Sequence, residues 1–207
     1  CYHIVTMYKD YFQKVAAFYD SLVDRFNIDF RSGDNGTQEN MLLKYRILTE
    51  ISDLDYSSIL EVGSNVGLFY KYLTEFLSSF KYTGIDISPR AYRVAAENEP
   101  DADFRNINIL DKDFNDTAEY ILADGLFNLG KMENISDYRN RALHKMFDLA
   151  EKGVAVNFLS SVSESKDESN LNYFDAGETL NFCLSLTPKA VLRHDYSPDN
   201  FTVYLYK

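Results

Sequence analysis

An acidic residue and two glycines, Glu61, Gly63 and Gly67, carry the clearest chemical signal of the chain. They lie in residues 58–67 (SILEVGSNVG), where an apolar run predicts a short buried strand that ends at the first glycine. Because glycine has no Cβ, it adopts positive φ angles and lets a ligand approach the backbone closely. The helix expected from Leu68 onward points unpaired N–H groups into the same crevice. The segment therefore predicts a strand–turn–helix unit that binds a nucleotide-like ligand.

The spacing of these glycines argues against a dinucleotide. A G-x-G-x-x-G pattern that starts at Gly63 requires two further glycines, where the chain has Asn65 and Leu68. A second apolar run, residues 82–88, contains Asp86, nineteen residues after the last glycine of the turn. A carboxylate at that point can accept hydrogen bonds from both hydroxyls of a ribose. A structural alternative, in which this aspartate only caps a helix, is disfavoured because both features occur in register.

Together, residues 61–67 (EVGSNVG) and 84–89 (GIDISP) resemble the two cofactor motifs of the class I S-adenosylmethionine (SAM) dependent methyltransferases. The resemblance spans roughly residues 57–207, and the chain looks like the small stand-alone bacterial members of that family. It implies an enzyme that uses SAM as cofactor and releases S-adenosylhomocysteine. The cofactor-binding residues that it implies are Glu61, Gly63, Ser64, Asn65, Gly67, Asp86, Ile87, Asn108, Ile109 and Asp124.

Asn108 departs from the family pattern. Methyltransferases of this class usually carry an acidic residue here, which contacts the amino group of the adenine. The side-chain carbonyl of an asparagine can also accept a hydrogen bond from that group. Asp111 and Asp113 are rival candidates for the same contact.

The remaining residues supply the elements of an α/β fold. Apolar periodicity and turn residues predict helices over 7–26, 37–54, 68–80, 89–99, 137–152 and 175–186, and strands over 59–62, 82–88, 102–110, 120–129, 153–159, 190–196 and 201–206. We expect a Rossmann-like, doubly wound, seven-stranded sheet with a C-terminal antiparallel hairpin and N-terminal helices. Residues 1–56 are expected to form a helical cap on a SAM-binding domain of residues 57–207, as one structural unit.

Candidate catalytic residues stand at the carboxyl ends of strands, where open α/β sheets place their active sites. Asp124 and Asn128 follow the fourth strand, and His194 in the hairpin is a further candidate base. For this histidine, a purely structural role is the alternative. Residues 124–127 (DGLF) outline the motif of amide and base N-methyltransferases but lack both of its prolines, so that activity is not inferred.

Two segments are long enough to cover the crevice. One is the polar loop of residues 160–172, and the other is the aromatic stripe of the helix over residues 7–26. We expect a chain without residues 1–26 to bind SAM but to transfer no methyl group.

These features predict methyl transfer to a hydroxyl, an amine or a phosphate-type oxygen of a small molecule. By analogy with the small bacterial members, the acceptor is expected to be a precursor of a surface polysaccharide or a secondary metabolite. The alternatives are a methyltransferase-like subunit that binds SAM without an acceptor site of its own, and an NAD-dependent reductase, which the glycine spacing disfavours.

The composition of the chain limits the kinds of partner that it is expected to bind. The formal net charge of −11 and a sequence pI near 4.7 oppose binding to nucleic acid or to an anionic membrane surface. No apolar run approaches the ~20 residues that span a bilayer, and no signal-peptide pattern occurs. The two cysteines, Cys1 and Cys183, and the three histidines do not cluster, so no metal site is expected. We expect a cytoplasmic protein, and the oligomeric state stays open.

Overall fold

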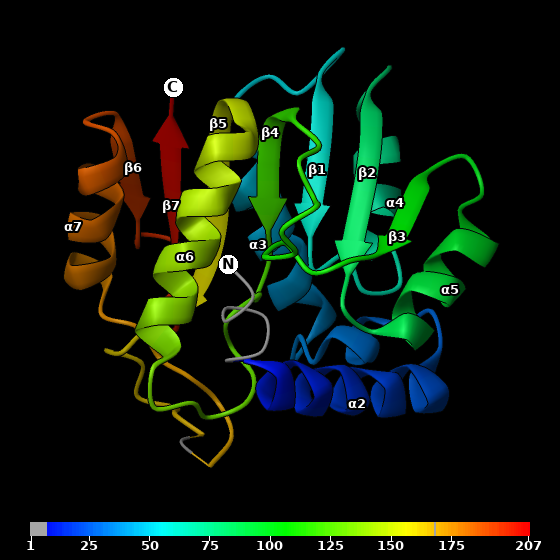
Figure 1. The fold of residues 1–207 in the computed structure, drawn as a ribbon, viewed down its shortest axis with the longest axis horizontal. Helices are drawn as coiled ribbons and strands as arrows, with labels where there is room; N and C mark the ends of the chain where they lie inside the picture. Colours follow the sequence, from blue (N-terminus) through cyan, green and yellow to red (C-terminus); the bar gives the residue numbers. More distant parts are fainter. Residues whose placement is uncertain (1–7, 168) are drawn as a thin grey trace.

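The computed structural model describes residues 8–167 and 169–207, which form a seven-stranded sheet with helices on both faces (Figure 1). The strand order is β3-β2-β1-β4-β5-β7-β6, and β7 runs antiparallel to both of its neighbours. The strands are β1 (Ser58–Val62), β2 (Lys81–Asp86), β3 (Asp103–Asn106), β4 (Ala118–Ala123), β5 (Ala150–Leu159), β6 (Ala190–Arg193) and β7 (Asn200–Tyr206). The predicted fold class, including the C-terminal antiparallel hairpin, is confirmed.

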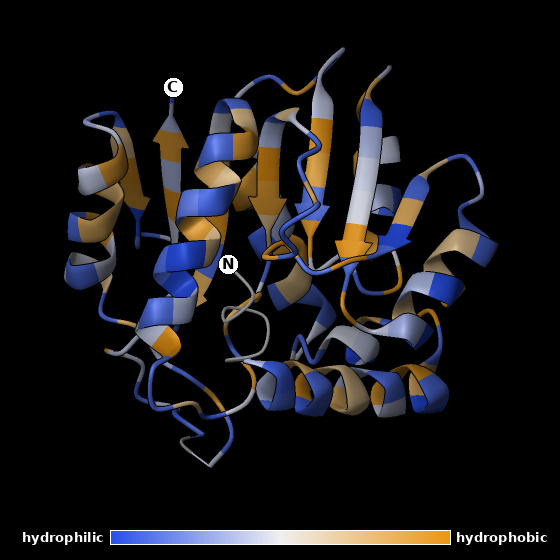
Figure 2. Cartoon of the chain, viewed as in Figure 1, coloured by the Kyte–Doolittle hydropathy of each residue, from blue (hydrophilic) through white to orange (hydrophobic). Residues whose placement is uncertain are grey.

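Alternating side chains of the central strands fill two hydrophobic clusters, one on each face of the sheet. In β1, Leu60 and Val62 belong to the cluster under α6 (Ile135–Leu149). Ile59 belongs to the other cluster, under α3 (Gln38–Thr49). Figure 2 shows the same division, with β4 mostly hydrophobic and the outer turns of α6 largely hydrophilic. Burial on both faces explains why the parallel strands are nearly continuous apolar runs.

The helices begin where the sequence supplies caps. Thr37, Ser88 and Asp175 each accept a hydrogen bond from a backbone N–H of the first turn that follows them. The helices not yet bounded are α2 (Lys9–Phe26), α4 (Leu68–Thr74), α5 (Pro89–Asn98) and α7 (Ala176–Leu186), together with a short 3₁₀ helix, η1 (Phe30–Gly33).

Several predicted boundaries were wrong. The strands predicted over 120–129 and 190–196 end at Ala123 and Arg193, and the helix predicted over 137–152 ends at Leu149. The helix predicted to end at residue 80 ends at Thr74, and Asp55 accepts the backbone N–H of Ser78 at 2.7 Å, which holds the chain in a turn. The helix predicted to reach residue 54 ends at Thr49. The strand predicted over 102–110 is paired only over β3, because the chain beyond Asn106 leaves the sheet to line a cavity.

Helix α2 lies across the carboxyl ends of β1, β2 and β4, at the end to which their arrows point in Figure 1. Hydrogen bonds to the loop after β4 and to the start of α5 fix it there. The Tyr11 hydroxyl donates to the carbonyl oxygen of Leu129 at 2.8 Å, and the Ser88 hydroxyl donates to Asp20 at 2.5 Å. The aromatic stripe of α2 therefore faces the edge of the sheet at which a ligand is expected.

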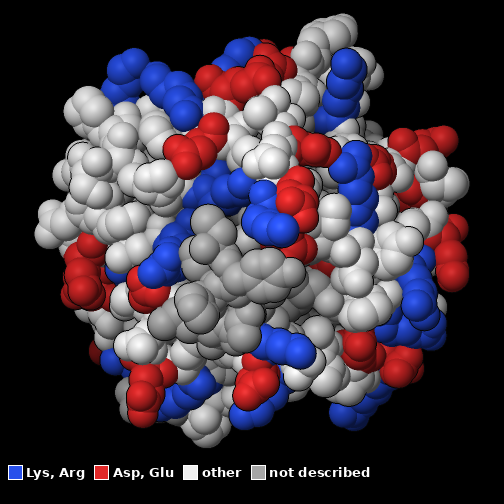
Figure 3. Space-filling view, viewed as in Figure 1, with Lys and Arg blue, Asp and Glu red and all other residues white. Residues whose placement is uncertain are grey.

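On the face seen in Figure 3, acidic and basic side chains lie next to one another. Within the described part of the chain, no helix combines the length and the apolar character needed to cross a membrane.

Candidate functional site

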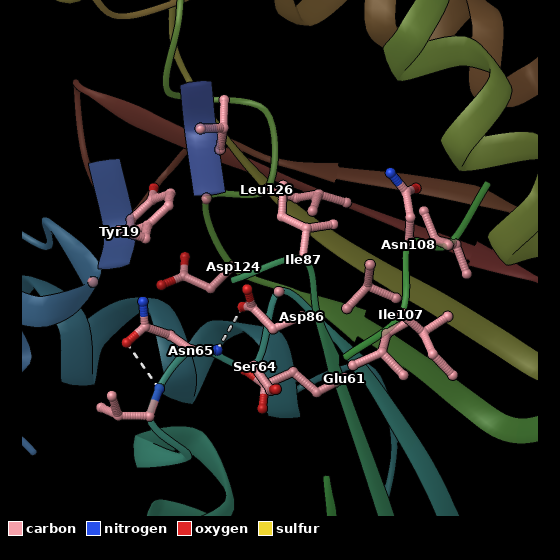
Figure 4. Close-up of a pocket in the computed structure, with 18 of the residues that line it drawn as sticks. Tyr19, Glu61, Ser64, Asn65, Asp86, Ile87, Ile107, Asn108, Asp124 and Leu126 are labelled. Carbon is pink, nitrogen blue, oxygen red and sulfur yellow. Dashed lines mark hydrogen bonds between the residues drawn. The ribbon is translucent and has the colours of Figure 1, made fainter. Parts of the chain in front are cut away.

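The turn after β1 brings the acidic end of β2 against its backbone. Val62 pairs with Ile85, so that Asp86 stands beside the turn. Its carboxylate accepts the backbone N–H group of Asn65 at 2.8 Å (Figure 4) and that of Ser88 at 2.7 Å. The side chain is buried, and burial raises the pKa of Asp86 to about 6, although the backbone hydrogen bonds act in the opposite direction.

The two glycines of the turn serve different purposes. Both have positive φ angles, +84° at Gly63 and +81° at Gly67. A Cβ at Gly67 would stand 2.9 Å from the ring of Phe104, so this glycine lets α4 and β3 pack closely. A Cβ at Gly63 would meet nothing nearer than the Leu126 side chain at 3.5 Å. Gly63 therefore leaves a methyl-sized space beside the turn.

Nine of the ten predicted cofactor residues line one cavity, which we call the first cavity; Gly67 is the exception. The nine are Glu61, Gly63, Ser64, Asn65, Asp86, Ile87, Asn108, Ile109 and Asp124. In Figure 4 the carboxylates of Asp86 and Asp124 and the ring of Tyr19 are directed toward the same space. The cavity encloses about 90 Å³, less than the roughly 300–1,000 Å³ usual for ligand pockets.

Sequence reasoning placed α2 over this crevice but did not assign its residues to the site. Tyr11, Phe12, Val15 and Tyr19 of α2 line the first cavity, as does Tyr45 of α3. The signal was present in the sequence, because three of these positions are spaced four residues apart along one helix face. Burial, together with carboxylates nearby, raises the pKa of Tyr19 above its ordinary value. The tyrosine is therefore a neutral hydrogen-bonding group at working pH.

Two buried polar side chains lie behind the turn. Glu61 accepts a hydrogen bond from the Tyr82 hydroxyl, and burial raises the pKa of Glu61 to about 8. The hydroxyl oxygen of Ser64 is buried and has no hydrogen-bond partner in the structure. An unpartnered hydroxyl at a cavity wall is the kind of group that a ligand satisfies.

At the adenine position, the side-chain oxygen of Asn108 accepts the backbone N–H of Leu110 at 2.9 Å. The carboxylate of Asp111 accepts the backbone N–H of Asn108 at 3.1 Å. The rival candidates Asp111 and Asp113 do not line the first cavity, whereas Asn108 does.

A second cavity, of about 250 Å³, adjoins the first. The two share Tyr19, Gly33, Asn35, Asp124 and Gly125 as lining residues. The other residues around the second cavity come from the segment before α3, from α3 itself, from the loops after β4 and β5 and from the β6–β7 turn; they are Asp34, Gly36, Asn40, Lys44, Asn128, Leu129, Leu159, Ser163, Ser165, Leu171, Tyr173, Ser197, Asp199 and Asn200.

Asp124 stands at the junction of the two cavities and is held by a cation that the sequence did not reveal. The Lys44 ammonium lies 2.9 Å from one Asp124 oxygen, and both side chains are 9% exposed. Lys44 also donates to the side-chain oxygen of Asn35 at 2.8 Å. The other carboxylate oxygen of Asp124 is buried without a partner, as is the side-chain oxygen of Asn128. Two buried acceptors therefore await hydrogen-bond donors here.

His194 lines neither cavity. Its ring packs edge-on against Phe201, with 5.9 Å between the ring centroids. His194 follows β6, the outermost strand of the sheet, and its Nε2 atom is buried without a hydrogen-bond partner. The structure thus brings Asp124 and Asn128 together and leaves His194 apart from them.

Comparisons with known proteins identify the family of this chain. A family model described as a methyltransferase domain matches residues 60–156. A curated protein of Mycobacterium tuberculosis (strain ATCC 25618 / H37Rv), named Putative methyltransferase Rv1506c, is 30% identical over an alignment of 166 residues. The match covers 76% of this chain and 97% of that protein.

Many solved structures share the fold, and two of them serve as examples. Magnesium protoporphyrin IX methyltransferase from Synechocystis PCC 6803, with bound SAM, matches 98% of this chain and 96% of its own, with a TM-score of 0.64 at 10% identity. The N-methyltransferase NodS from Bradyrhizobium japonicum WM9, in complex with S-adenosylhomocysteine, matches 91% of this chain and 97% of its own, with a TM-score of 0.62 at 16% identity.

The chain belongs to the class I SAM-dependent methyltransferases. It is an enzyme of that class, and its cofactor is SAM.

Proposed function

We propose that this enzyme methylates a small molecule that binds in the second cavity, with SAM in the first. The observation that carries the proposal is the position of Asp124, whose side chain lines both cavities and keeps one buried oxygen without a partner. The acceptor atom is a hydroxyl, an amine or a phosphate-type oxygen. The precursors of surface polysaccharides and secondary metabolites are the first small molecules to screen.

On the cofactor side, we assign Asp86 to the ribose hydroxyls and the backbone of residues 63–65 to the methionine part of SAM. Both oxygens of Asp86 already accept backbone N–H groups, yet each retains a lone pair for a hydroxyl donor. Asn108 and Ile109 are assigned to the adenine. Entry of SAM requires an outward shift of the α2 side chains, because they lie over a cavity smaller than the cofactor.

On the acceptor side, we assign Asp124 and Asn128 to the bound small molecule. Bound SAM supplies an electrophilic methyl group. The unpartnered oxygen of Asp124 can take the proton of a hydroxyl or ammonium acceptor, and Lys44 holds the carboxylate in place. Helix α2 excludes water from the junction by covering it.

The first test is ligand binding and activity of the full chain. At 100 times Kd, SAM or S-adenosylhomocysteine stabilises the fold by ~2.7 kcal/mol, which raises Tm by about 5–10 °C in a protein of this size. Asp124→Asn is expected to lower kcat by about 10²–10⁴ while S-adenosylhomocysteine affinity stays within about threefold. A folded protein whose melting curve ignores both ligands, or an Asp124→Asn variant with full kcat, contradicts the assignment.

A further inference from the structure

The second cavity is lined mainly by neutral polar side chains. Four are amides, Asn35, Asn40, Asn128 and Asn200, and further hydroxyls come from three serines and from Tyr19 and Tyr173. An amide offers both donors and an acceptor, and a hydroxyl offers one of each. Such a lining matches a ligand whose groups are themselves both donors and acceptors.

The charges around the cavity oppose an anionic ligand. Three carboxylates, Asp34, Asp124 and Asp199, line it, whereas Lys44 is its one cation among the described residues. The Lys44 ammonium is already engaged by Asp124 at 2.9 Å and by Asn35 at 2.8 Å. A phosphate or carboxylate in this cavity would therefore face negative charge without a free cation to bind it.

Two residues that line the cavity, Asp124 and Asn128, each carry a buried oxygen without a hydrogen-bond partner. The free oxygen of Asp124 and the side-chain oxygen of Asn128 are both acceptors. Leaving a buried acceptor unpaired costs about 1–3 kcal/mol, so a bound molecule that donates to both recovers that free energy. A hydroxyl can donate to each oxygen and still accept from the neighbouring amides and hydroxyls.

We propose that the acceptor is a neutral, hydroxyl-rich molecule of about the size of one sugar ring, and that Asp124 and Asn128 each accept a hydrogen bond from one of its hydroxyls. This inference rests on the proposed function and narrows it from three kinds of acceptor atom to a hydroxyl. The cavity encloses about 250 Å³, just below the roughly 300–1,000 Å³ usual for ligand pockets, which favours a ligand no larger than one ring. Tyr173, in the loop after β5, also lines the cavity, and its hydroxyl oxygen accepts the backbone N–H of Asp167 at 2.7 Å.

The experiment compares matched sugars on the full chain. Calorimetry on the complex with S-adenosylhomocysteine measures binding of methyl α-glucopyranoside, -galactopyranoside and -mannopyranoside. The same titrations use glucose 6-phosphate as the anionic probe and glucosamine as the amine. Turnover with SAM and each probe is followed by release of S-adenosylhomocysteine. At least one neutral glycoside is expected to bind and to be methylated with a kcat/KM about tenfold or more above that of the phosphate and the amine.

Two substitutions test the reason for the preference. Asp199→Asn removes the charge of a cavity carboxylate without changing the shape of the side chain. It is expected to raise kcat/KM for glucose 6-phosphate, relative to that for the neutral glycoside, by about threefold or more. Asn128→Leu is expected to weaken glycoside binding by about tenfold or more. Asp113→Asn removes a carboxylate that is largely exposed and lies outside the cavity. It is expected to change neither the preference against glucose 6-phosphate nor the affinity for the glycoside. Affinity for S-adenosylhomocysteine is expected to stay within about twofold in all three.

The outcomes separate the two proposals. If the chain binds S-adenosylhomocysteine but binds no neutral glycoside at ~10 mM, or methylates the phosphate or the amine at least as well, the sugar assignment is wrong and the methyltransferase function stands. If folded protein does not bind S-adenosylhomocysteine, both fail.

Discussion

The buried carboxylate of Asp86 both stabilises the turn after β1 and lines the first cavity. Its contacts with the N–H groups of Asn65 and Ser88 shape the turn, and its remaining lone pairs face the first cavity. Burial raises its pKa to about 6, so its charge changes within an accessible pH range. Ribose hydroxyls donate better to the ionised form, since protonation uses one of the lone pairs.

We expect SAM affinity to depend on the ionisation of Asp86. Since the folded pKa is raised, the carboxylate is protonated below about pH 6 and ionised above it. Affinity measured by calorimetry should be constant above pH 7 and fall by about tenfold at pH 5, where about a tenth of the carboxylate is ionised. Asp86→Ala should weaken binding by roughly 2–3 kcal/mol and abolish this pH dependence.

The control for this experiment is Asp113→Asn, which removes a largely exposed carboxylate. It should retain both the affinity and the pH profile of the parent chain. A folded Asp86→Ala protein with unchanged SAM affinity would mean that Asp86 only caps the turn.

At the scale of elements, local sequence signals predicted most of the fold. Gly63, Thr37, Pro89 and the hairpin turn are short-range signals, and each marks an element boundary in the structure. The helix predicted to run to residue 80 stopped early because Asp55, more than twenty residues away, engages the chain beyond it. A contact that distant leaves no trace in apolar periodicity.

The same limit explains which site residues the sequence revealed. The turn after β1 and the end of β2 follow motifs, and all but Gly67 line the first cavity. No signal in the sequence indicated that Lys44 belongs to the site, because its partner Asp124 lies eighty residues further along the chain. His194 was the opposite case, a residue type suited to catalysis that directly follows a strand at the edge of the sheet.

The two glycines of the turn should respond differently to alanine. Each has a positive φ, which costs a non-glycine residue about 1–2 kcal/mol. Gly67→Ala also forces a methyl group against the ring of Phe104, so we expect it to lower the free energy of unfolding by about 2–4 kcal/mol. Gly63→Ala should cost only the backbone term but should weaken SAM binding, because its methyl group stands in the first cavity. Denaturant unfolding and calorimetry measure the two effects.

Gly63→Ala and Gly67→Ala serve as controls for each other, in unfolding free energy and in SAM affinity. If Gly67→Ala is no less stable than Gly63→Ala, the contact with Phe104 does not explain the glycine. If Gly63→Ala binds SAM as tightly as the parent chain, the cofactor does not approach that backbone.

At the scale of the whole molecule, the N-terminal helices are part of the core. Tyr8 and Phe12 belong to the hydrophobic cluster on the α6 face of the sheet, and Tyr45 and Leu48 belong to the cluster on the opposite face. We therefore propose that residues 1–56 and 57–207 unfold together as one structural unit. The burial of α2 also revises the expectation that a chain without residues 1–26 still binds SAM.

We expect the chain that starts at residue 27 to lose its cooperative fold. Deletion removes four buried side chains, Tyr8, Phe12, Val15 and Val23, each worth roughly 1.5–3 kcal/mol. Their sum is comparable to the ~5–15 kcal/mol stability of a typical domain. Scanning calorimetry of the full chain should show one transition, with equal calorimetric and van't Hoff enthalpies. The truncated chain should show none.

Point variants keep α2 in the chain, so they test whether its buried side chains account for the stability that the deletion removes. Phe12→Ala should lower the free energy of unfolding by about 3–5 kcal/mol, because its ring is buried against Tyr138 and the Tyr8 ring. Lys14→Ala, an exposed position on the same helix, should change it by less than about 0.5 kcal/mol. A truncated chain that melts cooperatively and binds SAM would show instead that α2 is a dispensable lid, and the sheet with its remaining helices would then be the folding unit.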